Sequence, residues 1–209
     1  MEDCVFCDRE KILEDILHET DNFFVKVGLG ILTPGHVMVI PKGHYLCYGE
    51  LPDALEPEYG EIKRWTQEQV TERFAAPSIV EYTPGYGQSI HHAHSHFIPL
   101  KGDGYEVQSL LEEMFLPGNL NIEKADRKRL KQIYKQEGKY VSLEEDGTLY
   151  VCHVAGLTHD RANPNPHLSY RAFFAFNKGA GVLNWSKMTE DEKIVDQEKR
   201  RLTKRLFAA

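Results

Sequence analysis

The sequence predicts an α+β fold built around a mainly antiparallel sheet. Two segments rich in β-branched and aromatic residues, 22–28 and 36–42, flank a glycine-rich turn, which is typical of an antiparallel hairpin. A long helix is predicted over residues 55–76, and a second pair of strands over 78–85 and 89–100. The order hairpin, helix, hairpin accounts for the first 100 residues.

The helices are predicted from apolar spacing. In the 55–76 segment, Tyr59, Ile62, Trp65, Val70 and Phe74 recur at helical intervals and offer a face to a core. The segment "REKILEDILHET" (9–20) has apolar residues at i, i+1, i+4 and i+5, which predicts a short amphipathic helix ahead of the first strand.

The order of predicted helices and strands changes after Leu100. We expect helices over 107–115, 122–136 and 188–207, a hairpin turning at Asp146–Gly147, and a strand over 167–179. Thr189 and Glu192 have the spacing of a capping box at the start of the last helix. We therefore divide the chain into a core, residues 1–100, and a C-terminal α/β extension, residues 101–209. The sequence leaves open whether this extension is a separate subdomain or adds strands to the first sheet.

Composition excludes several classes of protein. With 209 residues and 41% hydrophobic residues, the chain can bury a core without disulfides. A net charge of −7 argues against broad nucleic-acid binding without ruling it out, and it permits a small anionic ligand. The basic stretches 124–135 and 198–207 are interpreted as solvated helix faces. No segment is long enough to span a membrane, and the acidic N-terminus is unlike a signal peptide, so we expect a cytoplasmic protein.

Four cysteines occur, at positions 4, 7, 47 and 152. Cys4 and Cys7 form a Cys-x-x-Cys pair, which indicates metal or redox chemistry in a reducing compartment. A thioredoxin-like site needs a preceding strand, and only three residues precede Cys4, so metal binding is favoured. Cys47 and Cys152 are expected to be buried as small hydrophobic residues.

The segment "GQSIHHAHSHFIPL" (87–100) contains four of the ten histidines. In a strand, His92, His94 and His96 would project from one face and His91 from the other. Such a row has three interpretations: exposed histidines on an amphipathic strand, a metal site made of three imidazoles, or phosphate chemistry. The row alone leaves all three open.

The surrounding residues resemble the histidine triad (HIT) superfamily of nucleotide hydrolases and transferases. Its motif, His-φ-His-φ-His-φ-φ, is similar to residues 92–98, and "PGHVMVIPKGH" (34–44) and "CVFC" (4–7) resemble two upstream blocks of its zinc-containing Hint-type and bacterial branch. The resemblance covers most of residues 4–100. It implies a histidine triad fold, with a mainly antiparallel sheet of about five strands and flanking helices.

The resemblance also implies catalytic roles. His94 would attack the α-phosphate of a nucleoside phosphoramidate, a dinucleoside polyphosphate or a related nucleotide conjugate, and would form a nucleotidyl-histidine intermediate that water hydrolyses. His96 would contact the phosphate or assist the leaving group. Gln88 and Ser89 would supply neutral hydrogen bonds.

The resemblance implies one structural zinc ion per chain. Cys4 and Cys7 would supply two thiolates, and His44 and His92 would complete a closed tetrahedron. On the same reading His36, which follows the Pro-Gly turn, would be a packing residue.

The predicted nucleoside-binding turn departs from the family's pattern. Hint-type and Fhit-type proteins hold the ribose hydroxyls with an acidic residue or asparagine, and Gly28 stands near that position. No Asp or Glu lies between Asn22 and Pro34. We therefore expect substrate contacts from the backbone of Gly28, Leu29 and Gly30, together with Gln88 and His96.

Other functions stay open. A nucleotidyltransferase would use the same intermediate, although transferase relatives typically carry Gln where His96 stands. The extension weakly resembles the C-terminal region of CwfJ-like RNA-processing proteins, which suggests a catalytically weak nucleotide- or RNA-binding module of a processing complex. A metal-dependent enzyme using all three histidines is a third alternative. Families of this kind often form homodimers through the helix and an edge strand, so a homodimer is a further expectation.

Overall fold

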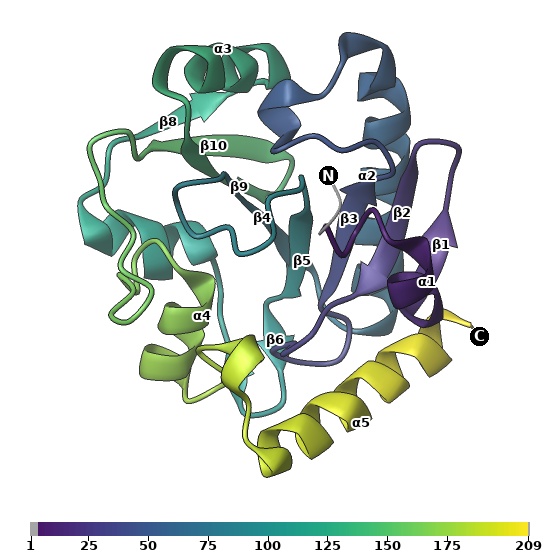
Figure 1. Cartoon of the computed structure of the whole chain (residues 1–209). Coiled ribbons are helices and arrows are strands. Elements are labelled where there is room, and N and C mark those ends of the chain that lie inside the picture. The colour runs from purple at the N-terminus through teal and green to yellow at the C-terminus, as the bar shows by residue number, and fades with distance from the viewer. Residues whose placement is uncertain (1–3, 209) are drawn as a thin grey trace.

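An eight-stranded sheet forms the centre of the computed structural model, which describes residues 4–208 (Figure 1). All neighbouring strands in this sheet are antiparallel, in the order β1-β2-β3-β5-β4-β9-β10-β8. The strands are β1 (Ile16–Glu19), β2 (Phe23–Val27), β3 (Val37–Pro41), β4 (Pro77–Tyr82), β5 (Ser95–Pro99), β8 (Ile122–Ala125), β9 (Tyr140–Glu145) and β10 (Thr148–His153), with a separate ribbon of β6 (Lys101–Gly102) and β7 (Tyr105–Glu106). The predicted α+β class is confirmed, and five of the strands lie within residues 16–99.

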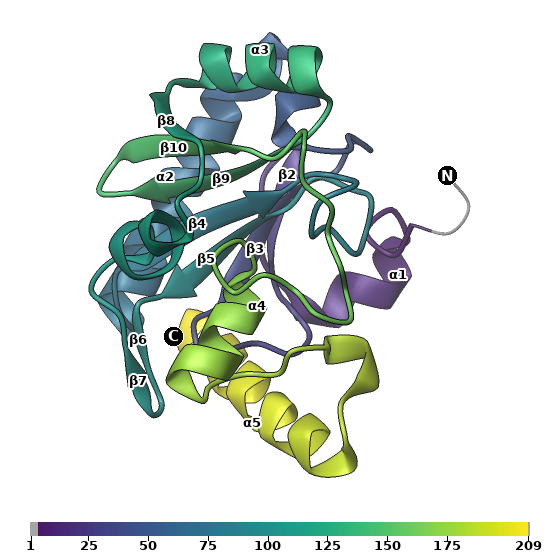
Figure 2. The same ribbon diagram turned by 90° about the vertical axis from the view of Figure 1, so that its left-hand side faces the viewer.

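Helices cover both faces of the sheet (Figure 2). The α-helices are α1 (Arg9–Ile12), α2 (Glu56–Arg73), α3 (Arg127–Glu137), α4 (Tyr170–Phe173) and α5 (Glu190–Phe207). Short 3-10 helices span Leu13–Asp15, Tyr48–Glu50, Asp53–Leu55, Leu116–Gly118 and Trp185–Lys187, and π-helical turns span Leu111–Phe115 and Phe174–Lys178. Alternate residues of β4 and β5 pack on opposite faces of the sheet. Ile79 and Phe97 pack toward α2, and Val80 and Ile98 pack toward α4.

The first 100 residues contain both predicted strand pairs. β2 and β3 form the expected hairpin, with Phe23 opposite Pro41 and Val27 opposite Val37. β5 pairs with β4 as expected, and it also pairs with β3, so it lies inside the sheet. The strand predicted over 89–100 begins only at Ser95.

The long helix α2 forms close to its predicted range. Pro57 lies in its first turn, where a missing N–H costs nothing, and the helix ends four residues before Pro77. Tyr59, Ile62 and Val70 are buried against the sheet.

The extension adds its strands to the first sheet. β9 pairs with β4 over Tyr82 to Ile79, and β10 and β8 follow outward. The predicted hairpin turn is present, and Asp146 and Gly147 both have positive φ, at 48° and 72°. This pair of left-handed residues gives a turn whose twist suits the twist of the strands.

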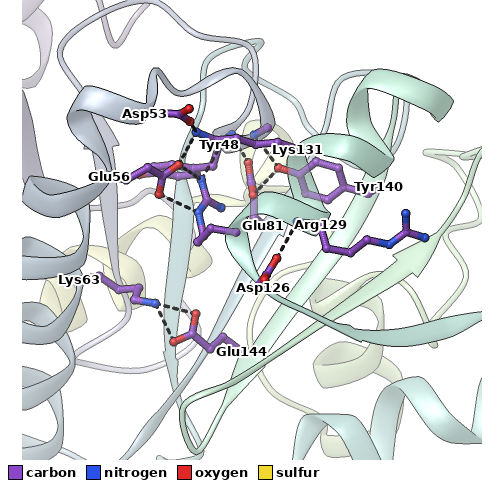
Figure 3. A network of polar contacts seen from close by, with 12 residues as sticks. Tyr48, Asp53, Glu56, Lys63, Glu81, Asp126, Arg129, Lys131, Tyr140 and Glu144 are labelled. Atoms are coloured by element: carbon purple, nitrogen blue, oxygen red, sulfur yellow. Dashed lines mark hydrogen bonds and ion pairs between the residues drawn. The ribbon is translucent and has the colours of Figure 1, made fainter.

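A polar network ties α2 and the loop before it to the extension (Figure 3). Lys131 of α3 contacts Asp53 and Glu56, both at 2.6 Å, and Lys63 of α2 contacts Glu144 of β9 at 2.8 Å. At its centre, the buried Glu81 carboxylate of β4 accepts hydrogen bonds from two tyrosines. The Tyr48 amide lies 2.6 Å from Glu81 and the Tyr140 hydroxyl 2.7 Å from it.

Further predicted elements were wrong in type or extent. The helix predicted over 107–115 is present only as the π-helical turn Leu111–Phe115. The helix predicted over 9–20 stops at Ile12, and Ile16–Glu19 is instead β1, because this segment completes the sheet edge beside β2. Residues 122–125 are a strand paired with β10 rather than the start of α3. The strand predicted over 167–179 is helical, with Ser169 capping its first turn and Gly179 ending it at φ 61°.

The helix predicted at the C-terminus is α5, and its capping box at Thr189 and Glu192 is present. Its last turns lie beside β1 and α1 (Figure 1), where Arg200 contacts Asp15 at 2.6 Å. Within residues 4–208, no helix combines the length and apolar character that crossing a membrane requires.

Candidate functional site

The three alternating histidines do not share one strand. His92 and His94 precede β5 in irregular backbone held by a hydrogen bond from the Ala93 amide to the Tyr45 carbonyl oxygen, at 2.6 Å, and only His96 lies in the strand. His92 is directed to the N-terminal cysteines, whereas the rings of His94 and His96 lie 5.0 Å apart. The row therefore divides into two neighbouring sites.

His94 is buried and its ring is oriented by the backbone. Its Nδ1 lies 2.6 Å from the carbonyl oxygen of His92. A carbonyl oxygen only accepts hydrogen bonds, so Nδ1 carries the proton and Nε2 keeps its lone pair. Burial, with smaller contributions from the charges of Lys26 and Arg171, lowers the pKa of His94 to about 4, so the imidazole is neutral near pH 7.

His96 is oriented by His36. The Leu32 amide donates to Nδ1 of His36 at 3.3 Å, which places the proton of neutral His36 on Nε2. That Nε2 lies 3.2 Å from Nδ1 of His96, which must then accept, so neutral His96 carries its proton on Nε2. Burial lowers the pKa of His36 to about 3 and that of His96 well below its usual range, which favours these neutral forms.

We call His36, His94 and His96 the histidine site. Two aromatic rings flank it: Phe6 lies 5.4 Å from the His94 ring, and Tyr170 lies 5.1 Å from the His96 ring. All three histidines are less than a tenth exposed. A surface groove of about 280 Å³ lies elsewhere, between Pro34 and α5, and includes none of these histidines.

Two cationic side chains, Lys26 and Arg171, act on His94 through their charge. Lys26 of β2 is buried and lies 3.8 Å from Asp15, and burial lowers its pKa to about 8. Arg171 of α4 lies over the Tyr170 ring, 5.2 Å from its centre. A ligand bound beside neutral histidines would therefore meet positive charge, which suits an anion.

The four predicted metal ligands come together. Cys4, Cys7, His44 and His92 place one ligand atom each within 4.8 Å of one another. The Sγ–Nδ1 distances are 3.2 Å for Cys7–His44, 3.4 Å for Cys4–His92 and 3.5 Å for Cys7–His92. Zinc bonds of about 2.3 Å to sulfur and 2.1 Å to nitrogen give tetrahedral edges of roughly 3.4–3.8 Å, so these residues fit a zinc ion.

His92 is oriented for that role by its second nitrogen. Nε2 lies 2.8 Å from the carbonyl oxygen of Pro41 and therefore donates, which leaves the Nδ1 lone pair directed at the cysteines. The same fixed tautomer is what a metal-ligating histidine needs.

Of the two residues predicted to supply neutral hydrogen bonds, Gln88 lies inside the protein and Ser89 on its surface. Gln88 is buried, and its amide nitrogen donates to the carbonyl oxygens of Leu46, at 2.8 Å, and His92, at 3.2 Å. Its Oε1 is buried without a hydrogen-bond partner among the described residues, so in this structure Gln88 presents an acceptor rather than a donor. Ser89 is exposed, and no described hydrogen bond joins it to the histidine site.

The extension contacts the predicted nucleoside-binding turn, in which Gly28 and Gly30 are buried and Leu29 is exposed. Arg171 donates to the carbonyl oxygens of Gly30, at 2.7 Å, and Leu29, at 3.2 Å. This stretch of sequence has no carboxylate of its own, but Asp196 of α5 accepts a hydrogen bond from the Ile31 amide at 2.9 Å and is buried beside the turn. Gly30 has φ 61°, and a Cβ there would lie 2.7 Å from Cβ of Trp185.

Sequence reasoning missed four residues around the histidine site: Phe6, Lys26, Tyr170 and Arg171. None of these four carried a sequence signal for the site. His36 did carry one, its place in the Pro-Gly-His segment, but it was interpreted as a packing residue. Tyr170 and Arg171 lie about 75 residues from the histidines in a segment predicted as a strand, so no local pattern could have placed them there.

Comparison with known proteins adds independent information. No family model matches the chain. "Protein hit" of Bacillus subtilis is 30% identical over 141 residues, which cover 62% of this chain and 95% of that protein. An uncharacterized HIT-like protein of Methanocaldococcus jannaschii is 28% identical over 110 residues, covering 50% of this chain and 85% of the relative. Among solved structures, a Zn-bound histidine triad family protein from Mycobacterium smegmatis is 21% identical with a TM-score of 0.40, covering 65% of this chain and 99% of that chain.

Proposed function

The chain belongs to the histidine triad (HIT) family, and on that premise we propose that it is a nucleotide hydrolase with His94 as its nucleophile. Its substrates would be nucleoside phosphoramidates, dinucleoside polyphosphates or related nucleotide conjugates. The observation that carries the proposal is the hydrogen bond from Nδ1 of His94 to the His92 carbonyl oxygen, because it leaves a neutral nitrogen lone pair free.

In the first step, Nε2 of His94 attacks the α-phosphorus, and the bond from phosphorus to the leaving group breaks. The Nε2–H of His96, fixed by the hydrogen bond with His36, would donate a hydrogen bond to the leaving oxygen or nitrogen, and the leaving group would take its proton from solvent water, so that His96 stays neutral. Water then attacks the phosphorus and releases one proton to solvent, and the phosphorus–nitrogen bond to His94 breaks. The reaction is thereby divided into two displacements, each at one phosphorus atom.

Lys26 would stabilise the negative charge of the phosphoryl group, because it is a buried cation whose charge acts on His94. The backbone of Gly28, Leu29 and Gly30 would contact the nucleoside. Because the histidines are nearly buried, a nucleotide can reach His94 only if side chains that cover the site, such as Phe6 and Tyr170, move aside.

A zinc ion held by Cys4, Cys7, His44 and His92 would have a structural role. Four protein ligands leave no open coordination position, so the ion would supply a crosslink rather than an activated water. The crosslink would join the N-terminus, the loop after β3 and the segment that carries His94. It would thereby support the backbone carbonyl that orients the nucleophile.

The test is turnover and adduct formation with His94→Ala. We would incubate the wild-type protein, His94→Ala and His91→Ala with adenosine and guanosine 5′-phosphoramidates and with diadenosine polyphosphates, and follow product release and intact protein mass. His91 is exposed in the same segment and serves as the matched control. We expect His94→Ala to lose at least about a thousandfold in rate. Full activity in His94→Ala, or a covalent nucleotide on it, would exclude His94 as the nucleophile.

Nucleotidyl transfer is the alternative that the same intermediate permits. Adding phosphate, pyrophosphate or sugar phosphates to the reaction distinguishes the two, because a transferase would divert the nucleotide from water to the acceptor. Absence of turnover across the panel, with RNA binding in its place, would instead support a binding module.

A further inference from the structure

Arg171 joins the extension to the predicted nucleoside-binding turn. It lies on α4, 141 residues from Gly30, and its guanidinium donates to the Gly30 carbonyl oxygen at 2.7 Å and the Leu29 carbonyl oxygen at 3.2 Å. A further hydrogen bond of 3.3 Å reaches the Val182 carbonyl oxygen. These three contacts hold the guanidinium in one place beside the histidine site.

The charge of Arg171 is not neutralised by any carboxylate among residues 4–208. The arginines at 127 and 200 are shielded to a similar degree, and each pairs with an acid: Arg127 with Glu56 at 3.0 Å and Arg200 with Asp15 at 2.6 Å. Arg171 contacts carbonyl oxygens, the Tyr170 ring and the Tyr170 hydroxyl, which are all neutral groups. A fixed cation without a counter-ion creates a local positive potential that favours an anionic ligand.

The three hydrogen bonds to carbonyl oxygens do not use all the N–H donors of the guanidinium. It carries five N–H groups, and its three hydrogen bonds to carbonyl oxygens use two on Nη1 and one on Nη2. The Nε–H and one Nη2–H are not used by these carbonyl contacts, and the Tyr170 hydroxyl is a further, neutral partner of the guanidinium. Two N–H groups on one planar fork match two oxygens of a phosphate.

Tyr170 links this cation to the nucleophile. The guanidinium lies 5.2 Å from the Tyr170 ring, that ring lies 5.1 Å from His96, and His96 lies 5.0 Å from His94. The cation thus lies between the turn expected to hold the nucleoside and the histidine expected to attack phosphorus. A phosphate bound between this turn and His94 would lie near the guanidinium.

We propose that Arg171, supplied by the extension, binds a phosphate of the nucleotide substrate and holds it beside His94. This inference rests on the proposed function and adds to it a substrate contact outside the histidine motif. It also gives the extension a direct part in the site, since the core alone offers no arginine there.

The experiment measures binding of nucleoside 5′-monophosphates and of the corresponding nucleosides by titration calorimetry. The variants are Arg171→Met, which keeps the apolar stem but removes the charge, and Arg171→Lys, which keeps the charge without the fork. Arg129→Met, at a surface ion pair on α3, is the matched control. We expect Arg171→Met to weaken monophosphate binding about tenfold or more, with nucleoside binding unchanged and partial recovery in Arg171→Lys.

Each other outcome overturns the inference in a recognisable way. Equal loss of monophosphate and nucleoside binding would show that Arg171 only supports the Gly28 to Gly30 turn. Unchanged binding of both would remove Arg171 from the site while leaving the proposed function intact. Failure of the wild-type protein to bind any nucleotide would overturn the proposed function, and this inference with it.

Discussion

Backbone carbonyl oxygens decide which ring nitrogen of His92 and of His94 is free. Nε2 of His92 donates to the Pro41 carbonyl oxygen, so Nδ1 faces the cysteines; Nδ1 of His94 donates to the His92 carbonyl oxygen, so Nε2 is free. Two imidazoles that are two residues apart therefore present opposite nitrogens to two different partners. A spacing of two in the sequence could not show this, because the accepting carbonyls belong to the folded backbone.

His36 is expected to act on the reaction as a positioning residue. His36→Phe removes the donor that holds Nδ1 of His96, and we expect kcat to fall about tenfold to a hundredfold with little change in KM. His36→Gln can still donate from its amide and should recover part of the rate. Steady-state kinetics of both variants check this. A folded His36→Phe protein with wild-type kcat would contradict it.

At the scale of elements, the pairing of β4 with β9 buries a carboxylate in the middle of the sheet. Burial raises the pKa of Glu81 to about 7, although the amide of Tyr48 and the hydroxyl of Tyr140 partly offset this effect. The folded state thus favours the protonated acid. Stability from this group is complete below its unfolded pKa, near 4.5, and is lost as the pH rises through about 7.

Glu81→Gln tests this pH dependence. The amide keeps the size of the side chain and does not ionise. Its oxygen can still accept from the Tyr48 amide, while its NH2 would donate to the Tyr140 hydroxyl in place of the present bond. The stability of the variant relative to the wild type should therefore rise with pH. From pH 5 to pH 8 we expect the difference in unfolding free energy to change by about 2 kcal/mol in favour of the variant. Urea unfolding at several pH values measures it, with exposed Glu68→Gln of α2 as the control for charge loss. A difference that does not change with pH would contradict the prediction.

Elements predicted from local signals were the most accurate. The Asp146–Gly147 turn, the capping box of α5 and the apolar face of α2 each depend on neighbours within a few residues, and each is present. β1 and the helix at residues 169–179 were predicted as the wrong type. β1 is a strand because β2 offers it an edge, and in the helix the Ser169 cap and Gly179 outweigh the β propensity of its aromatic residues.

At the scale of the whole molecule, contacts distant in sequence close the fold around the site. The N-terminal cysteines meet His44 and His92, and α5 returns from the C-terminus to place Arg200 and Lys204 on Asp15, each at 2.6 Å.

The division at residue 100 stays a prediction, as does the C-terminal resemblance to CwfJ-like proteins. A homodimer also stays a prediction. Because β9 occupies the edge of β4, the strands left at the edges of the sheet are β1 and β8.

Zinc removal is expected to lower the thermal stability of the fold. One zinc ion per chain should copurify with the protein. Cys7→Ser or prolonged chelation should lower the melting temperature by about 10 °C. The reason is that a structural site contributes several kcal/mol to stability, and about 1 kcal/mol shifts the melting temperature of a protein of this size by about 2–4 °C. Elemental analysis and thermal unfolding measure both quantities, and His91→Ala should retain its zinc. A chelated protein with an unchanged melting temperature would rule out a structural metal.

The sequence by itself determined the family, the α+β class, the main hairpins and helices, and a set of cysteines and histidines that the fold does bring together. These follow from spacing, caps and turns, which act over a few residues, and from motifs that are readable in order. Only the tertiary structure decided that the extension continues the same sheet, that His36 orients His96, and that Tyr170 and Arg171 stand beside the histidines. Those facts depend on strand pairing, burial and hydrogen-bond partners between segments 60 to 140 residues apart, which no local pattern encodes.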